Sequence, residues 1–188
     1  MACAVYSRTV PHVTVETLQA GLAGVRAAPP DEGRVELIVR RPAENEREVV
    51  EHAELDLEFG LVGDMWHRRG TRRGGPNPLA QLTLMSSRLA ALVAGDREQW
   101  PQAGDQLYVD FDLSEANVPA GTRLAVGSAV IEVTSEPHTG CAKFSARFGS
   151  AALRFINAPE GRKLHLRGIN ARVIEPGAVA TGDAISKL

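Results

Sequence analysis

The chain has 188 residues, of which 44% are hydrophobic and 23% are charged, and its formal net charge is -2. This length suffices for one sizeable core, and the composition is that of an ordinary globular protein. The near balance of charge lacks the basic excess of a nucleic-acid-binding protein, and no apolar run is long enough to span a membrane. The first residues lack the apolar core of a secretion signal, and two cysteines make no disulfide framework. We therefore expect a cytoplasmic protein that has neither nucleic acid nor membrane as a partner.

Residues 1–33 suggest an N-terminal helical extension. Thr14 is placed to cap a helix, because its hydroxyl can accept a hydrogen bond from an otherwise unpaired amide of the first turn. The apolar positions of this helix share one face: Val15, Leu18, Leu22 and Val25. Pro29, Pro30 and Gly33 end the helix and mark a turn. A helix this short is marginal alone, so we expect it to pack on the main domain.

Short strands dominate the remainder of the chain. Val35, Leu37 and Val39 alternate with Glu36 and Arg40, which predicts a strand with these three apolar residues on one face that ends before Pro42. Further strands are expected near residues 53–59, 81–85, 107–113, 129–133 and 164–173, with a last one after Gly182. Between them, Ser86 or Ser87 caps a predicted helix that ends at Gly95.

Turn signals separate these strands at regular intervals. Gly-Asp pairs occur at Gly63, Gly95, Gly104 and Gly182. Many short strands, frequent turns and few helices favour a domain whose sheet closes on itself over a doubly wound parallel sheet. The predicted fold is mainly β with short helices, as a closed or partly closed β-barrel over residues 34–188.

The apolar phase of the last long strand changes partway. Leu164 and Leu166 share one phase, whereas the apolar residues from Ile169 onward share the other. Glycine tolerates the left-handed backbone that a bulge often needs. We therefore expect a β-bulge at Gly168.

The stretch PHTGCAKFSARFG at residues 137–149 concentrates the candidate chemistry. Thr139 is a plausible N-cap, which would place Cys141 in the first turn of a helix, where unpaired amides and the helix dipole favour negative charge. His138, Lys143 and Arg147 are close in sequence. Such surroundings favour the thiolate, which is the form of cysteine that reacts or binds metal. The alternative is a small, buried apolar cysteine with no chemical role.

A second stretch of interest is the arginine-rich loop at residues 65–78. Its arginines are Arg68, Arg69, Arg72 and Arg73, and glycine and proline residues lie among them. Arginine forks suit phosphate, so the loop could bind an anion over a pocket. A solvated surface loop with no ligand is the alternative. The sequence contains neither a G-x-G-x-x-G nor a Walker-type phosphate loop, and the two cysteines lie too far apart in sequence for a zinc motif.

Several ordered pieces of the chain together resemble the MOSC domain, which occurs at the C-terminus of molybdenum cofactor sulfurases and as stand-alone bacterial proteins. The pieces are VRRP at 39–42, GLVGD at 60–64, GDQL at 104–107, LSEANVPAG at 113–121, PHTGC at 137–141, KF at 143–144, RGI at 167–169 and GD at 182–183. They cover roughly residues 34–188.

The resemblance implies a β-rich barrel that binds the molybdenum cofactor, a pterin dithiolene with a terminal phosphate. It also implies that Cys141 acts as the reactive residue, either as a sulfur carrier in persulfide form or as a ligand on the metal side; soft sulfur suits both roles. The candidate cofactor-binding residues are His138, Lys143, Arg147, Arg167, Arg73 and Asn117. Among the arginines we favour Arg147 and Arg167, because regular elements position side chains better than loops do.

The chain departs from its relatives in two places. Some stand-alone members carry a His-Gly-Gly turn where this chain has Arg73 followed by two glycines, which puts their reductase chemistry in doubt. The pyridoxal-phosphate domain of the full sulfurases is also absent, so we expect no generation of sulfane sulfur from cysteine by this chain.

Three functions remain open at this point. The first is cofactor handling through Cys141, with a sulfur-donor protein as a possible partner. The second is reduction of N-hydroxylated small molecules by the bound cofactor with an electron-donor protein. The third is a non-catalytic binding module in which Cys141 belongs to the core.

Overall fold

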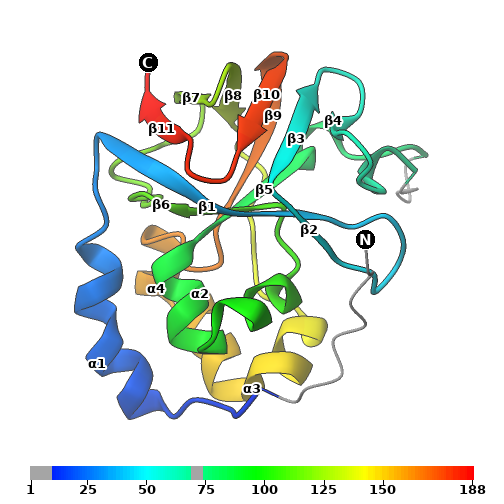
Figure 1. The fold of residues 1–188 in the computed structure, drawn as a ribbon. Helices are drawn as coiled ribbons and strands as arrows, with labels where there is room; N and C mark the ends of the chain where they lie inside the picture. The colour runs from blue at the N-terminus through cyan, green and yellow to red at the C-terminus, as the bar shows by residue number, and fades with distance from the viewer. Residues whose placement is uncertain (1–9, 69–73) are drawn as a thin grey trace.

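In the computed structural model, which describes residues 10–68 and 74–188, strands occupy one half of the molecule and the helices α1–α4 the other (Figure 1). The helices are α1 (Val15–Arg26), α2 (Ser87–Ala94), α3 (Ala142–Asn157) and α4 (Pro159–Lys163), with 3-10 helices η1 (Trp66–Arg68), η2 (Pro78–Ala80) and η3 (Arg97–Ala103). The strands are β1 (Glu32–Arg40), β2 (Glu48–Val50), β3 (His52–Asp56), β4 (Gly60–Leu61), β5 (Leu82–Ser86), β6 (Leu107–Asp110), β7 (Arg123–Val126), β8 (Ala129–Val133), β9 (Ile169–Glu175), β10 (Gly177–Ala180) and β11 (Ala184–Lys187).

The barrel closes because β1 pairs along both of its edges. The start of β1 pairs with β11, its end pairs with β2, and its other edge pairs with β6. The ring runs β11-β7-β8-β9-β5-β6-β1 and returns to β11. The β5–β6 pair is parallel, whereas the other pairs of the ring are antiparallel. Strands β10, β3 and β4 form a second, small sheet. The predicted closed β-barrel with short helices is therefore confirmed.

Two apolar cores lie on opposite sides of the barrel wall. The barrel interior holds one core, to which β6 contributes Leu107 and Val109. Tyr108, between them, points outward into a second core between the barrel and the helices. Leu18 of α1 and Phe144 and Phe148 of α3 also belong to this second core. Successive residues of β6 therefore face the two cores in alternation, and both phenylalanines of α3 pack in the core under the helices.

The facing of β1 differs from the prediction. Val35 lies in the barrel interior, but Leu37 and Val39 belong to the core under the helices. The register against β6 shifts between Val35 and Leu37, so Glu36 is an extra residue that reverses the alternation. The prediction that all three apolar residues share one face is wrong, because a one-residue bulge moves each later side chain to the opposite face.

The last long strand also differs from the prediction. Strand β9 begins only at Ile169, and Leu164 and Leu166 lie in the turn that follows α4. Gly168 adopts the expected left-handed backbone with φ +104°, but it lies before the strand. A register shift in the β8–β9 pair instead makes Ile174 the extra residue. The bulge predicted at Gly168 is therefore wrong, and the phase change arises from a turn that precedes the strand.

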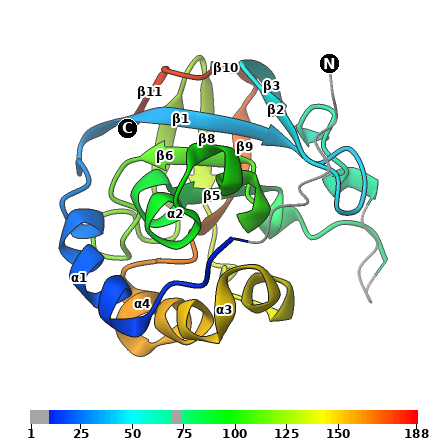
Figure 2. The same cartoon turned by 60° about the horizontal axis from the view of Figure 1, so that its bottom comes forward.

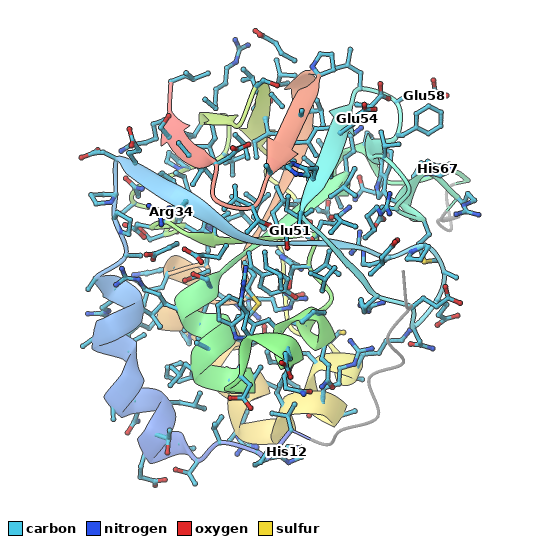
Figure 3. The ribbon with its side chains drawn as sticks, viewed as in Figure 1. His12, Arg34, Glu51, Glu54, Glu58 and His67 are labelled. Atoms are coloured by element: carbon cyan, nitrogen blue, oxygen red, sulfur yellow. The ribbon has the colours of Figure 1, made fainter. Side chains whose placement is uncertain are left out.

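The helices form a layer under one side of the barrel (Figure 2). Thr14 caps α1 as predicted, because its Oγ1 accepts a hydrogen bond from the Thr17 amide. Helix α1 packs against α2 and α3. Helix α3 kinks at Gly149, where φ is +90° and the ring of His12 lies against the glycine, beside α3 at the foot of the view in Figure 3. None of the helices in the described ranges is both long and apolar enough to cross a membrane.

Replacement of Gly168 by alanine should destabilise the fold. A Cβ at this position would lie 2.0 Å from the carbonyl oxygen of Leu84, and φ is +104°. Left-handed strain and overpacking together give an expected loss of about 2–5 kcal/mol in the free energy of unfolding. Urea denaturation measures this loss. Gly182→Ala is the matched control, because its φ is +96° but its Cβ would meet no atom within 4 Å. Equal losses in the two variants would contradict the steric explanation.

Candidate functional site

Cys141 borders a hollow of about 360 Å³, which we call the thiol hollow. Its wall is formed by the segment after β1, the ends of η2 and η3, the start of β5, the loop before α3, the first turns of α3, and the residues on either side of the start of β9. The lining residues with polar or charged side chains are Arg41, Arg47, Thr83, Glu136, His138, Thr139, Cys141, Lys143, Arg147, Arg167 and Asn170. The thiol is exposed rather than buried in the core. The hollow therefore brings a solvent-accessible sulfur and several cationic side chains together.

The helix that follows the cysteine begins two residues later than predicted. Cys141 itself is the N-cap of α3, so Thr139 lies outside the helix and the prediction of Thr139 as the cap is wrong. The preceding turn is held by Asn157 from the far end of the same helix. Its Oδ1 accepts a hydrogen bond from the Gly140 amide at 3.0 Å, and its Nδ2 donates to the Gly140 carbonyl at 3.1 Å. This pair of bonds fixes the position of Cys141. It joins the two ends of α3, and the kink at Gly149 lies between them.

Three arginines converge on Gly104, at the end of η3. Arg41 donates from Nη1 to the Gly104 carbonyl at 2.9 Å. A Cβ built on Gly104 would lie 3.5 Å from Nη2 of Arg47 and 3.9 Å from Nη1 of Arg147. Arg147 donates to the backbone carbonyl of Gln102 at 2.5 Å, and among the described residues no carboxylate forms a salt bridge with it. A backbone carbonyl orients a guanidinium without neutralising it, so Arg147 keeps its positive charge available to an anion.

A buried polar cluster forms the floor between the hollow and the barrel. Asp105 is fully buried, and its Oδ2 accepts a hydrogen bond from Nη1 of Arg167 at 2.7 Å. Arg167 also donates to the Ala103 carbonyl and lies over the ring of Phe144, 5.4 Å from its centroid. Nε2 of His138 lies 3.5 Å from the other Asp105 oxygen. The charges of Asp105 and Arg167 neutralise each other, and this pairing allows the Arg167 guanidinium to be buried.

Several atoms of this cluster have no hydrogen-bond partner among the described residues. They are Oδ1 of Asp105, Nδ1 of His138 and Nε of Arg167. Buried polar atoms are nearly always paired with protein, water or a bound group. Their concentration at the wall of a hollow therefore marks this wall as a place where a ligand or an ordered water completes the hydrogen bonding.

The charge of His138 differs from the sequence-based expectation. Burial lowers the pKa of His138 well below its usual value, and the positive charges of Arg167 and Arg41 lower it further. His138 is thus a neutral imidazole at neutral pH and adds no positive charge beside Cys141. Burial also raises the pKa of Asp105, against the opposing effect of Arg167.

The sequence reasoning missed two buried acids that position the arginines of the site. Asp64 accepts hydrogen bonds from Nε and Nη2 of Arg41 at 2.7 and 3.0 Å, and Asp105 pairs with Arg167. Both acids belong to Gly-Asp pairs, which we interpreted only as turns. The sequence does not show which acid faces which arginine, because the partners lie 23 and 62 positions apart.

The structure does not bring all predicted residues to the hollow. Asn117 donates from Nδ2 to the carbonyls of Pro30 and Asp112, and its Oδ1 accepts a hydrogen bond from Lys187. It therefore braces a turn away from the thiol hollow and does not line it. Lys143 lines the hollow and forms an exposed salt bridge of 2.8 Å with Glu44.

The arginine-rich loop contributes little to the described part of the site. Arg68 donates to the carbonyl of Pro42 and does not line the hollow. Arg73, like Arg69 and Arg72, lies outside the described residues. The expectation that Arg147 and Arg167 line the pocket agrees with their positions, although Arg167 is committed to Asp105.

Replacement of His138 by glutamine should flatten the dependence of stability on pH. The native imidazole is neutral, whereas the unfolded chain takes up a proton below about pH 6.5, so acid favours unfolding. The wild type should lose up to about 1.4 kcal/mol per pH unit from this residue as the pH falls below 6.5. Urea denaturation at pH 7, 6 and 5 measures the slope.

His52→Gln is the control for this experiment, because it makes the same substitution at an exposed position of β3 that is remote from the Asp105 cluster. A slope in His138→Gln equal to that of the wild type would show that the buried imidazole carries a proton in the folded state.

Comparisons with known proteins agree with this architecture. The family model described as the MOSC domain matches residues 79–186. The solved structure of the YUAD protein from Bacillus subtilis has a TM-score of 0.62 at 20% identity, over 82% of this chain and 94% of that chain. YiiM from Escherichia coli has a TM-score of 0.54 at 22% identity, over 82% of this chain and 69% of that chain.

A third solved structure, YiiM from Geobacillus stearothermophilus, has a TM-score of 0.56 at 15% identity, over 83% of this chain and 75% of that chain. At such identities the likeness concerns the fold. A search of curated protein sequences finds no significant match. Because the family model covers more than half of the sequence and the barrel closes as such a domain requires, the chain belongs to the MOSC domain family.

Proposed function

We propose that this chain binds the molybdenum cofactor in the thiol hollow, with Cys141 as a sulfur carrier or as a ligand on the metal side. MOSC domains are associated with binding of this cofactor. The observation that carries the proposal is that the exposed thiol of Cys141 and the guanidinium of Arg147 line one hollow, and that no carboxylate within residues 10–68 and 74–188 pairs with that guanidinium. The thiol suits soft sulfur chemistry, and the guanidinium suits an anion.

The anionic end of the cofactor is its terminal phosphate. Arg147 presents a guanidinium fixed by the Gln102 carbonyl, and Arg47 lies beside it over Gly104. Lys143, on the first turn of α3, also lines the hollow, and its exposed salt bridge with Glu44 can exchange for a phosphate oxygen at little cost. Guanidinium forks bind phosphate through paired, charge-assisted hydrogen bonds, so these residues would hold the phosphate and set the orientation of the pterin.

The sulfur end of the site is Cys141. When bound, the cofactor would supply a molybdenum centre, for which a soft thiolate is a suitable ligand. In the carrier role, the Cys141 thiolate attacks the sulfane sulfur of a donor protein and the donor's own thiolate leaves, so that Cys141 holds a persulfide. The Asn157 bonds to Gly140 keep the thiol at the mouth of the hollow in both roles.

The buried cluster beneath the hollow suits a bound polar group as well. Nε of Arg167 and Nδ1 of His138 have no partner among the described residues, and both side chains line the hollow. A pterin ring carries several donors and acceptors that such atoms could pair with. Because His138 is neutral, it can offer either a donor or an acceptor according to its tautomer.

Replacement of Arg147 by glutamine should weaken cofactor retention. A charge-assisted hydrogen bond contributes about 1.5–3 kcal/mol, so the expected loss of affinity is roughly tenfold or more. The protein is co-produced with the cofactor-synthesis enzymes, and the pterin and molybdenum contents of the purified protein are measured. Arg154→Gln is the matched control, because Arg154 is exposed on the same helix and lines no described hollow. Equal pterin contents in the wild type and Arg147→Gln would contradict the phosphate assignment.

Replacement of Cys141 by alanine distinguishes the two roles of the thiol. If Cys141 is a metal-side ligand, the variant should retain pterin but lose most of its molybdenum. If Cys141 is a sulfur carrier, both contents should stay the same, and intact-mass analysis should show a 32 Da persulfide adduct, roughly the mass of one sulfur atom, in the wild type only. The absence of both differences would count against any role for the thiol and would favour a non-catalytic module.

The reactivity of Cys141 should reveal the charge of the hollow without any cofactor. Iodoacetate is anionic and iodoacetamide is neutral, so a cationic hollow concentrates the first reagent at the thiol. We expect the iodoacetate-to-iodoacetamide rate ratio to fall about threefold or more in Arg147→Gln and to fall with added salt. Arg154→Gln should keep the wild-type ratio. A ratio that is insensitive to both Arg147 and salt would refute the cationic environment.

A further inference from the structure

A second hollow lies on the other side of the loop that precedes α3. Its volume is about 420 Å³, which is within the range of small-molecule sites. Apolar side chains that line it include Val133, Ile156 and Ile169. Arg162, Lys163 and His165, from the end of α4 and the turn after it, supply much of its polar wall. Neither Cys141 nor Arg147 lines this hollow, so it is distinct from the thiol hollow.

The two hollows share a wall. His138, Arg167 and Asn170 line both of them. Arg167 is 8% exposed and its Nε has no partner, and Nδ1 of His138 is buried without a partner among the described residues. A ligand in the second hollow would therefore lie against the same polar wall as a ligand in the thiol hollow.

The charge of the second hollow is balanced, unlike that of the thiol hollow. Arg167 is neutralised by Asp105. The remaining cations, Arg162 and Lys163, are matched by two acids, Glu115 and Glu136. Transfer of an ion from water into a partly apolar hollow costs free energy unless a counter-charge compensates it, and this wall offers no net excess of either sign. The balance favours an uncharged ligand.

A strained residue helps to shape this hollow. His165 has φ +45°, which is uncommon for a residue other than glycine. Its Nδ1 lies 2.7 Å from the Leu113 carbonyl, and because a carbonyl only accepts, Nδ1 carries the hydrogen. Nε2 is then the polar atom of the ring that remains for another partner. Left-handed backbone outside glycine costs about 1–3 kcal/mol and persists where the surrounding structure enforces it.

We propose that the second hollow binds a small, uncharged organic substrate with one hydrogen-bonding end, which lies against the His138–Arg167 wall opposite the cofactor. The inference rests on the proposed function, since it places the substrate beside the group bound in the thiol hollow. The apolar side chains hold the body of the substrate, and the shared wall orients its polar end.

Three probes of one shape and different charge test this proposal: benzamide, benzoate and benzamidine. Each is titrated into the 15N-labelled full-length protein, and amide shifts are followed by NMR. Benzamide should move the amides of Thr134, Ile169 and the turn at His165, and should bind this hollow more tightly than either charged probe. Ala120→Trp, at an exposed turn that lines only this hollow, should weaken benzamide binding about tenfold or more.

The controls separate this hollow from the thiol hollow. Ala146→Trp, at an exposed position of α3 that lines neither hollow, should leave benzamide binding unchanged, as should Cys141→Ala and Arg147→Gln. Unchanged benzamide binding in Ala120→Trp, or preferred binding of benzoate or benzamidine at these amides, would overturn the proposal.

Cofactor retention distinguishes the failure of this inference from the failure of the proposed function. Ala120→Trp protein co-produced with the cofactor-synthesis enzymes should keep its pterin and molybdenum. Loss of both would assign the second hollow to the cofactor and overturn the inference. The opposite outcome is also possible: benzamide binds as expected, but Arg147→Gln and Cys141→Ala leave the pterin and molybdenum contents and the persulfide adduct unchanged. The second hollow then stands as a ligand site, and the proposed function fails.

Discussion

The buried pair of Asp105 and Arg167 is the interaction on which the site depends. Asp105 comes from the turn before β6 and Arg167 from the turn before β9, so the pair ties two parts of the barrel rim together. Because each charge needs the other to be buried, the pair holds both turns in one arrangement. His138 lies against the same carboxylate, and Arg167 and His138 then form the common wall of the two hollows.

The arginines that line the thiol hollow differ in their hydrogen-bond partners. Arg41 and Arg167 are held by the buried carboxylates of Asp64 and Asp105, so their charges are neutralised and their role is to shape the rim. Arg147 is held by a backbone carbonyl, which orients the guanidinium and leaves its charge uncompensated. This difference concentrates positive charge beside the exposed thiol of Cys141. It also leaves the second hollow close to electrical balance, although the two hollows share a wall.

Much of the fold could be predicted from the sequence, and the errors have local causes. Alternating apolar residues located β5, β6 and β8, and Thr14 located the start of α1. The facing of Leu37 was predicted wrongly because Glu36 is a bulge, and the pattern of apolar residues does not show where a ladder takes up an extra residue. The start of β9 was placed too early because the apolar residues Leu164 and Leu166 pack in a turn.

The sequence by itself determined that the chain forms a β-rich closed domain, and it singled out the stretch around Cys141 as the candidate site, because periodicity, turn residues and motif order are local properties. Only the tertiary structure decided which side chains meet there. Asp105 lies 62 positions from Arg167, and Asn157 returns from the far end of α3 to hold Gly140. It also placed Asn117 outside the lining of the thiol hollow and lowered the pKa of His138, because burial and partner choice depend on how distant segments pack, and local sequence does not encode either one.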